Sequence, residues 1–382
     1  MPEPVYVAGA GMTRFGKFPD TPFEDFGVRA IRAALKDASA AITQVEALFL
    51  GTVYGGMVAG QRVLAQVGAT GIPVVNIENA CSSGAAAIRD AWIAVRAGLY
   101  DVVVAAGVEK MTDRVSGGIL VDKSDLDTAL GMVMAANHGM SARRYMSDYG
   151  ATREQIAAVA VKNHTHSMHN PYAQYQRPIS LNEVLSARLI ADPLGLYDCS
   201  PISDGGAAVV ICSAAGLARL GLSESAPRIL GVGLVSGTHN DGVRSINDEG
   251  ISRRGGVAAW ELSGIDPTDI DFVEMHDCFS IAEIVRMEGL GLIPRGEGAK
   301  WTQDGLTSLG GRLPVNPSGG LLSCGHPIGA TGARQACELT WQLRGQAHGR
   351  QVDGARTALA YCKGGTVSGT DGASVSTLVM QA

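Results

Sequence analysis

The sequence has little charge, few aromatic residues and no long uninterrupted apolar run. Only 18% of its 382 residues are charged and 5% are aromatic, whereas 46% are hydrophobic and 50 are glycine. This composition excludes a coiled coil or a disordered tail and favours a compact α/β protein with many tight turns. The net charge of −6 argues against binding to nucleic acid or to an anionic membrane, because both attract clustered lysine and arginine.

Signals for export or membrane insertion are also missing. No basic start leads into an apolar run, and no stretch reaches the roughly 18 apolar residues of a spanning helix. Residues 378–382, Leu-Val-Met-Gln-Ala, do not resemble the Ser-Lys-Leu peroxisomal signal. We therefore expect a cytoplasmic enzyme that contacts neither membrane nor nucleic acid.

Features of metal and cofactor sites are equally scarce. The cysteines are odd in number and none are spaced Cys-x-x-Cys, which argues against a disulfide framework or a zinc ribbon. His164, His166 and His169 do not share one helical face, so we expect a solvated polar surface there and no metal. Gly9-Ala-Gly11 lacks the third glycine of a dinucleotide fingerprint. The free thiols are Cys81, Cys199, Cys212, Cys278, Cys324, Cys337 and Cys362.

The chain repeats its own plan. An apolar strand ends in glycines at 5–11 and again at 228–233, and a helix end leads into an apolar strand at 41–50 and again at 265–274. Each half then continues with further strands and helices in alternation. Such alternation predicts an α/β fold with a mostly parallel sheet that is covered on both faces.

The region between the two halves breaks this pattern. Residues 112–196 are rich in Met, His and Tyr and contain few strand-like runs, whereas 207–211 is again an apolar strand. We therefore predict an inserted loop domain at 112–196, an N-terminal half made of 1–111 and 197–224, and a C-terminal half at 225–382.

The first chemical motif is Asn79-Ala-Cys81-Ser-Ser-Gly84, placed between a predicted strand at 74–77 and a helix at 83–97. A cysteine at a helix start meets the positive end of the helix dipole and free backbone N–H groups, which lower a thiol pKa. An arbitrary cysteine is more often a small buried hydrophobe. The turn position and the small neighbours favour a thiolate nucleophile here.

The second motif is Gly325-His326-Pro327, at the equivalent turn of the second half. The repeated plan predicts that His326 and Cys81 lie at the same ends of neighbouring strands, where α/β folds place their ligands. A thiol beside an imidazole is the minimum apparatus for covalent acyl transfer.

Two more motifs follow predicted strands. His276-Asp-Cys278-Phe supplies a second imidazole and a second thiol, and Cys362-Lys-Gly364 supplies a third thiol. Each of these two cysteines is as readily a core residue as a reactive group. The residues alone leave both interpretations open.

Together the four motifs resemble the thiolase superfamily over essentially the whole chain. Residues 81–84 resemble the family's nucleophile turn, and 316–332 resemble its glycine-rich lead into Gly-His-Pro. Residues 204–208 resemble the segment after the loop domain, with Ser200 where a pantetheine contact is expected. The resemblance implies a duplicated thiolase fold, in which two βαβαβαββ halves form a five-layered αβαβα core and the inserted loop domain covers the coenzyme A site.

The motif at His276 is similar to the sterol-carrier-protein type of thiolase, since most thiolases carry Asn-Glu-Ala-Phe there. In that branch the histidine forms an oxyanion hole with the histidine that corresponds to His326, and the cysteine, here Cys278, can act as acid/base. Cys362 and Gly364 match the Cys-x-Gly motif that supplies the acid/base in ordinary thiolases. Both candidate thiols are present in this chain.

The resemblance implies an acyltransferase of the acetyl-CoA acetyltransferase type, in lipid metabolism and β-oxidation, that cleaves a 3-oxoacyl-CoA with coenzyme A or runs the reverse condensation. Cys81, prepared by His326, would attack the 3-keto carbon and carry the acyl group. Backbone N–H groups of Cys81 and Gly364 would hold the oxyanion, and His276 and His326 the enolate oxygen. Coenzyme A is then a substrate, with no bound cofactor and no metal.

The resemblance also implies partners. Relatives form dimers, sometimes paired into tetramers, so a homodimer or homotetramer is expected. Some thiolase-like subunits act with a small OB-fold partner and perform specialised acyl transfer or retro-aldol cleavage, which is the alternative function. A non-catalytic acyl-CoA-binding subunit is a third interpretation, and the four intact reactive motifs argue against it.

Overall fold

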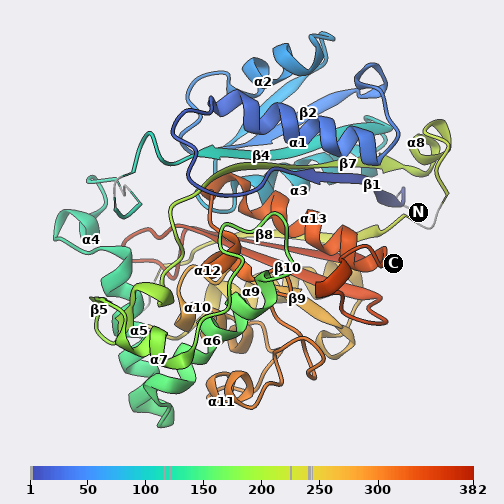
Figure 1. The fold of residues 1–382 in the computed structure, drawn as a ribbon. Coiled ribbons are helices and arrows are strands. Elements are labelled where there is room, and N and C mark those ends of the chain that lie inside the picture. Colours follow the sequence, from blue (N-terminus) through green and yellow to red (C-terminus); the bar gives the residue numbers. More distant parts are fainter. Residues whose placement is uncertain (1–2, 116, 120–121, 224–225, 240–241, 243) are drawn as a thin grey trace.

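The computed structural model of the chain describes residues 3–115, 117–119, 122–223, 226–239, 242 and 244–382. Figure 1 shows two stacked α/β halves, with the N-terminal half in blue above and the C-terminal half in gold to red below. A mostly helical region, in green, lies against the lower half. In the described part of the chain, no helix combines the length and the apolar character needed to cross a bilayer.

The N-terminal half has the expected βαβαβαββ order. Its strands and helices alternate until the green region interrupts them, and one strand and a short helix complete the half afterwards. The elements are β1 (Val5–Met12), α1 (Phe23–Asp37), β2 (Ala47–Gly51), α2 (Ala59–Gly68), β3 (Val74–Ile77), α3 (Ser83–Arg96), β4 (Val102–Lys110), β7 (Asp204–Ser213) and α8 (Ala214–Arg219).

The C-terminal half repeats this order with one reduction. Its third strand is only a parallel bridge between Val273 and Val315, so the glycine-rich segment that follows starts close to the sheet. The elements are β8 (Arg228–Ser236), α9 (Gly250–Ser263), β9 (Phe272–Glu274), α10 (Ser280–Gly289), α11 (Gly298–Gln303), α12 (Gly320–Cys324), α13 (Thr331–Leu343), β10 (Thr357–Gly364) and β11 (Ser374–Gln381).

The green region packs on the C-terminal half. Its helix α6 contacts α10, α11 and α12, and apolar side chains such as Ile156 on α6 and Ile284 on α10 share one buried cluster. The elements are α4 (Leu126–Ala129), α5 (Met134–Tyr149), α6 (Arg153–Ser167), α7 (Leu181–Ser186), β5 (Leu189–Ala191) and β6 (Leu194–Gly195).

This packing corrects one expectation. His164 and His166 on α6 are buried, so the prediction of a solvated polar surface is wrong for them, although His169 is exposed. The His166 ring bonds the Asn316 carbonyl through Nδ1 at 2.9 Å and accepts the Leu309 N–H at Nε2 at 3.1 Å. Burial lowers the pKa of His164 to about 4 and of His166 to about 3. Both histidines are therefore neutral: His166 belongs to the packing between α6 and the C-terminal half, and His164 packs against Tyr175 and Tyr197.

The central sheet is mixed, and the expectation of a mostly parallel sheet is wrong. The strand order is β3-β2-β4-β7-β1-β8-β11-β10-β9. Parallel pairing occurs between β2 and β3, β2 and β4, and β9 and β10, and the other neighbours are antiparallel. The reason is that β10 returns directly into β11 without a helical crossover, and β7 runs antiparallel to both of its neighbours, β4 and β1.

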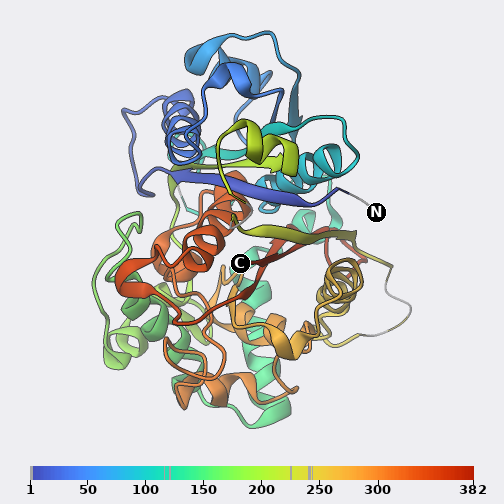
Figure 2. The same cartoon turned by 90° about the vertical axis from the view of Figure 1, so that its right-hand side faces the viewer.

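The two halves form five layers. Within the described residues, the strands of the two halves pair only where β1 meets β8, at Val5 with Ile229 and at Tyr6 with Arg228, so the sheet divides into two leaves. One buried cluster lies between the leaves and contains side chains of α3 and α13. Separate clusters pack α1 and α2 on one outer face and α9 and α10 on the other. Figures 1 and 2 show the resulting αβαβα stack, which confirms the fold class expected from the resemblance.

Glycines allow α3 and α13 to touch at their N-termini. A Cβ on Gly84 would lie 2.7 Å from the carbonyl oxygen of Gly329, and a Cβ on Gly332 would lie 2.4 Å from the backbone nitrogen of Ala85. Both distances are shorter than van der Waals contact, so a side chain at either position would push the helices apart. The two glycine-rich motifs thus bring their turns together between the sheet leaves.

Candidate active site

The turn between β3 and α3 presents Cys81 two residues before the helix begins. Ala80 adopts a left-handed conformation with φ 48°, which costs a non-glycine residue about 1–2 kcal/mol and persists only where its surroundings impose it. The Asn79 N–H donates to Ser83 Oγ at 2.9 Å, and the Ser82 N–H donates to the Asn79 carbonyl at 3.0 Å. These bonds fix the cysteine in place, with 4% of its surface exposed.

The Cys81 thiol is neutral at rest. Burial raises its pKa to about 12, and the nearby Cys278 adds to the shift, whereas Arg286 opposes it. The expectation that the helix start makes Cys81 a thiolate is therefore wrong for the resting protein. Removing water from a thiolate costs more than the end of α3 contributes. To act as a nucleophile, Cys81 would need a base.

His326 has the form of such a base. Its Nδ1 lies 2.7 Å from Thr331 Oγ1, and the threonine hydroxyl donates to the Pro327 carbonyl at 3.2 Å. The hydroxyl must then accept from Nδ1–H, which leaves the lone pair on Nε2. Among the described residues, Nε2 has no hydrogen-bond partner. Burial, helped by His276, holds the pKa of His326 well below its usual range, so the ring is neutral.

Cys81, His276 and His326 form one cluster. The Sγ of the cysteine and a ring nitrogen of each histidine all lie within 4.8 Å of one another. The two rings meet edge to face, with centroids 4.9 Å apart and an interplanar angle of 89°. We expected these three residues to converge, and the tertiary structure brings them together from three separate turns.

Cys362 and Gly364 lie behind the nucleophile turn. Cys362 Sγ donates to the Cys81 carbonyl at 3.0 Å and is 3.4 Å from His276 Nδ1. A Cβ on Gly364 would lie 2.1 Å from the Asn79 carbonyl oxygen, so only glycine allows β10 to pass this close. Burial raises the pKa of the Cys362 thiol well above its usual value. Cys362 is thus a neutral thiol, pinned to the backbone of the nucleophile turn.

Cys278 is in the opposite state. Its Sγ accepts a hydrogen bond from Arg286 Nη1 at 3.5 Å and lies 3.8 Å from His138 Nε2. Burial by itself would raise the thiol pKa, but Arg286, His138 and His276 together bring it well below its usual value. Cys278 is therefore a buried thiolate, held chiefly by the guanidinium of Arg286 against its sulfur.

The loop that carries Cys278 is anchored from several sides. The Ser200 N–H donates to the Cys278 carbonyl at 3.0 Å, which ties the expected pantetheine contact to the backbone of this loop. The Asp277 carboxylate accepts the Leu321 N–H at 2.6 Å and the Asn163 side-chain amide at 2.7 Å. The green region, through Asn163 on α6, thereby helps to position the loop that carries Cys278.

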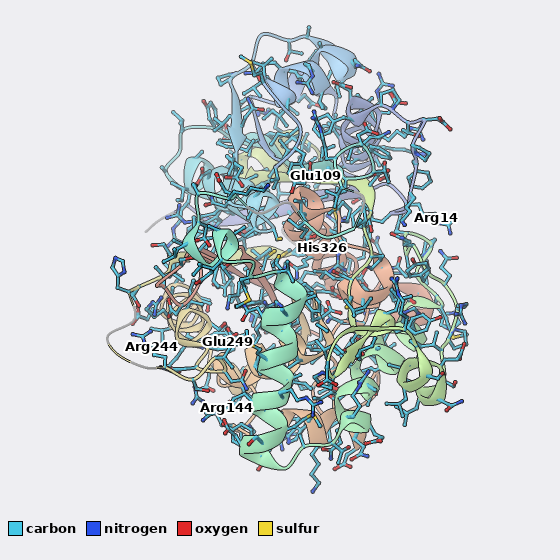
Figure 3. All side chains as sticks on the ribbon, turned by 90° about the vertical axis from the view of Figure 1, so that its left-hand side faces the viewer. Arg14, Glu109, Arg144, Arg244, Glu249 and His326 are labelled. Carbon is cyan, nitrogen blue, oxygen red and sulfur yellow. The ribbon has the colours of Figure 1, made fainter. Side chains whose placement is uncertain are left out.

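Glu109, at the end of β4, braces the segment after His326. Its carboxylate accepts the backbone N–H groups of Val53 at 2.9 Å, Tyr54 at 3.0 Å and Gly329 at 3.1 Å. Burial raises the pKa of this carboxyl to about 7, although these hydrogen bonds oppose the shift. Figure 3 shows Glu109 and His326 close together at the junction of the two halves.

Sequence reasoning missed Arg286, His138 and Glu109. An arginine inside the otherwise apolar run Ile-Val-Arg-Met of α10 was a usable signal, because arginine is rarely buried without a partner. Glu109 ends an apolar strand, which was a weaker signal. His138 lies in the region without a clear pattern, 140 residues before Cys278, and nothing local points to it.

A neutral buried thiol, a neutral imidazole with a free lone pair, a second imidazole and an ionised second thiol meet where two helices begin. This set defines a class of enzyme that transfers acyl groups through a cysteine nucleophile. The comparisons with known proteins agree. Residues 5–215 match the family model of the thiolase N-terminal domain, and 244–377 match the thiolase C-terminal domain-like model. The chain belongs to the thiolase family and is an acyltransferase of the thiolase type.

Two curated relatives match nearly end to end. The acetyl-CoA acetyltransferase of Methanothermobacter thermautotrophicus is 39% identical and covers 95% of this chain and 96% of its own. The benzoylsuccinyl-CoA thiolase subunit BbsB of Thauera aromatica is 40% identical, with 94% of each chain covered. Sterol carrier protein 2 of Bos taurus is 39% identical and covers 94% of this chain and 69% of its own.

Solved structures agree with the fold. The Ltp2-ChsH2(DUF35) aldolase aligns over 100% of this chain and 98% of its own, with a TM-score of 0.85 and 28% identity. Human mitochondrial 3-ketoacyl-CoA thiolase aligns over 100% and 99% with a TM-score of 0.76. At 19% identity, the second likeness shows the fold alone.

Proposed function

We propose that this thiolase cleaves a 3-oxoacyl-CoA with coenzyme A, or runs the reverse condensation, through an acyl group carried on Cys81. The observation that carries the proposal is the cluster in which Cys81 Sγ lies within 4.8 Å of a histidine nitrogen and His326 Nε2 is free of any partner among the described residues. Coenzyme A is a substrate, and the chain is expected to need no metal. Cytoplasmic β-oxidation is the setting we assign.

In the first half-reaction, His326 Nε2 takes the proton of the Cys81 thiol as Sγ attacks the 3-keto carbon. The oxyanion is held by backbone N–H groups at the start of α3 and by that of Gly364. Collapse of this intermediate breaks the C2–C3 bond and leaves the electron pair on C2. The product is an acyl-Cys81 and an enolate thioester, whose oxygen accepts hydrogen bonds from His276 and His326.

The enolate carbon then needs a proton, and Cys278 is our candidate to deliver it. Cys278 and Cys362 both lie near the nucleophile, but Cys362 is pinned by its hydrogen bond to the Cys81 carbonyl at 3.0 Å. Its pKa is raised well above the usual value, so it would release a proton reluctantly. Cys278 rests as a thiolate beside Arg286 and His138, so it must take up a proton before it passes one to C2, and it then returns to the thiolate.

In the second half-reaction, coenzyme A loses its thiol proton to Cys278 and attacks the acyl group on Cys81. The Cys81 sulfur leaves and recovers its proton from His326, which restores the resting state. Ser200, whose backbone bonds Cys278, is the proposed pantetheine contact. We assign residues 112–196 as the loop domain over the coenzyme A site, between an N-terminal half at 1–111 and 197–224 and a C-terminal half at 225–382.

The test is intact-protein mass spectrometry after mixing the protein with acetyl-CoA or acetoacetyl-CoA. The wild type is expected to gain one acetyl group and to cleave acetoacetyl-CoA in the presence of coenzyme A. Cys81→Ser should gain none, whereas Cys199→Ser serves as a matched cysteine control and should acylate normally. A wild type that never acylates, alone or in complex, would rule out the proposed function.

A second candidate function follows from the similarity to the Ltp2-ChsH2(DUF35) aldolase. In that interpretation the chain works with a small OB-fold partner and performs specialised acyl transfer or retro-aldol cleavage. Purification from the native source decides between the two: a co-purifying small protein that is needed for acylation favours the partner-dependent function. A homodimer or homotetramer that acylates by itself favours the thiolase function.

A further inference from the structure

Arg286 is a buried cation beside Cys278. It lies on α10 with 4% of its surface exposed. Its Nη1 donates to the His276 carbonyl and to Cys278 Sγ, the latter at 3.5 Å. A buried guanidinium is stable only beside groups that accept its hydrogen bonds and balance its charge. The sulfur of Cys278 is therefore the anionic partner that this site requires.

His138 approaches the same sulfur from the other side. Its ring stacks on Phe279, with centroids 4.2 Å apart and an interplanar angle of 17°. Its Nδ1 donates to the Met134 carbonyl at 2.9 Å, which leaves Nε2 facing Cys278 Sγ at 3.8 Å. The ring is thus held in one orientation, and its second nitrogen can give a proton to the sulfur or take one from it.

The two neighbours differ in their access to solvent. Cys278 is 5% exposed and Arg286 is 4% exposed, whereas His138, on α5, is half-buried. Figure 3 shows α5 running along the surface up to the region in which His326 is labelled. His138 therefore connects a buried thiol to the outside of the molecule.

We propose that Arg286 keeps Cys278 ionised and that His138 relays protons between Cys278 and solvent, so that the acid/base of the reaction is a Cys278–His138 pair. The proposal rests on the proposed function, in which Cys278 is the acid/base. It makes both residues positioning residues, because each acts on the substrate only through Cys278.

The proton balance is complete in both half-reactions. In cleavage, the imidazolium of His138 gives its Nε2 proton to the Cys278 thiolate, and the same proton then passes to C2 of the enolate, which leaves Cys278 a thiolate and His138 neutral. In thiolysis, the coenzyme A proton passes to Cys278 and from there back to His138. The pair thus starts and ends as thiolate and imidazolium, and Arg286 stabilises the thiolate at both ends of the cycle.

The surrounding charges favour this assignment. Glu249 is the carboxylate that acts on Arg286, and it is ion-paired with Lys363 at 3.2 Å, so the positive charge of Arg286 remains available to Cys278. The other titratable groups that act on Arg286 or Cys278 are Cys81, Cys199, His276, His326, Tyr361 and Cys362.

The first test needs no activity. The ultraviolet absorbance of thiolate is followed from acid to alkaline pH in the wild type and in Cys278→Ser. The wild type is expected to carry about one thiolate more at neutral pH. His138→Gln and Arg286→Lys should each move this titration to higher pH, while His169→Gln, an exposed histidine of the same region, leaves it unchanged. A titration that neither variant moves would overturn the proposal.

The second test separates a relay from a structural role. His138→Ala should lower kcat for thiolysis at least about tenfold, as loss of a proton-transfer group does. It should leave the amount of acetyl group on Cys81 unchanged. Added imidazole should restore kcat, because it can occupy the space of the missing ring and carry the same proton. Normal acylation with no loss of kcat would refute the relay and leave the proposed function intact, whereas absent acylation in the wild type would refute the proposed function.

Discussion

Two cysteines occupy the same local position in this protein, and their thiols are in opposite states. Cys81 stands two residues before α3, and Cys278 stands two residues before α10. They are 4% and 5% exposed, so the two thiols are buried to the same extent. Yet the pKa of Cys81 is raised to about 12, and that of Cys278 is held well below its usual value.

The difference lies in what surrounds each sulfur. Cys278 has Arg286 at 3.5 Å and His138 at 3.8 Å, whereas the ring nitrogens within 4.8 Å of Cys81 Sγ belong to two neutral histidines, His276 and His326. A helix start is thus too weak to ionise a buried thiol by itself, and a buried cation is strong enough. One site thereby holds a protonated thiol at Cys81, the proposed nucleophile, and an ionised thiol at Cys278, the proposed acid/base.

The largest effect is expected at His326, the proposed base for the Cys81 thiol. His326→Ala should lower the rate of Cys81 acylation by about 10²–10⁴-fold, because a thiol with a pKa near 12 must then ionise unaided. The remaining rate should rise about tenfold per pH unit across the stable range, since the thiolate fraction does so. The check is a time course of Cys81 acylation, quenched at intervals and read by mass spectrometry, from neutral to alkaline pH. A pH-independent residual rate would show that the Cys81 thiolate is already formed.

A second prediction sharpens the contrast between Cys278 and Cys362. Cys278→Ser should keep the acyl adduct on Cys81 and lower kcat for thiolysis about 10²-fold, since the proton donor is lost. Cys362→Ser should lower kcat less than about tenfold, because serine can keep the hydrogen bond to the Cys81 carbonyl. Steady-state thiolysis of acetoacetyl-CoA measures both variants. The reverse ranking would transfer the acid/base role to Cys362.

A third prediction concerns a substitution that should disturb the surroundings of Cys81 and leave those of Cys278 unchanged. Gly332→Ala would place a Cβ 2.4 Å from the Ala85 backbone nitrogen, so α13 must move away from α3. We expect a loss of about 1–3 kcal/mol in the free energy of unfolding and a fall in Cys81 acylation, because His326 moves with α13. The Cys278 thiolate should persist, since α10 is not displaced. Gly118→Ala, where a Cβ meets nothing within 4 Å, is the matched control.

The smallest effect is on stability, and it has opposite signs for the two thiols. Cys81 has a raised pKa in the folded state, so its contribution is fully present below the unfolded value near 9 and is lost as pH rises towards 12. Cys278 has a depressed pKa, so its contribution is present above the unfolded value and is lost as pH falls through the folded one. Denaturant unfolding of the wild type, Cys81→Ser and Cys278→Ser across pH measures both slopes. Parallel slopes for the two variants would contradict the comparison.

Much of the fold could be predicted from the sequence. The duplication and the four reactive turns were predicted, because glycines such as Gly84 and Gly332 and apolar strand runs are local features, whereas the five layers were implied by the resemblance to the thiolase superfamily. The sheet direction was not, because β10 returns into β11 where a helical crossover was expected. The burial of His166 was missed for a similar reason: its bond to the Asn316 carbonyl joins residues 150 positions apart.

The sequence by itself determined which chemical groups the site contains and which turns carry them, since residue type and turn chemistry are local properties. It left open whether Cys278 or Cys362 is the acid/base. Only the tertiary structure decided the charge that each thiol carries, because a pKa depends on burial and on partners such as Arg286 and His138 that lie far away along the chain. Those partners enter the low-dielectric interior together only when α5 and α10 fold against the same loop.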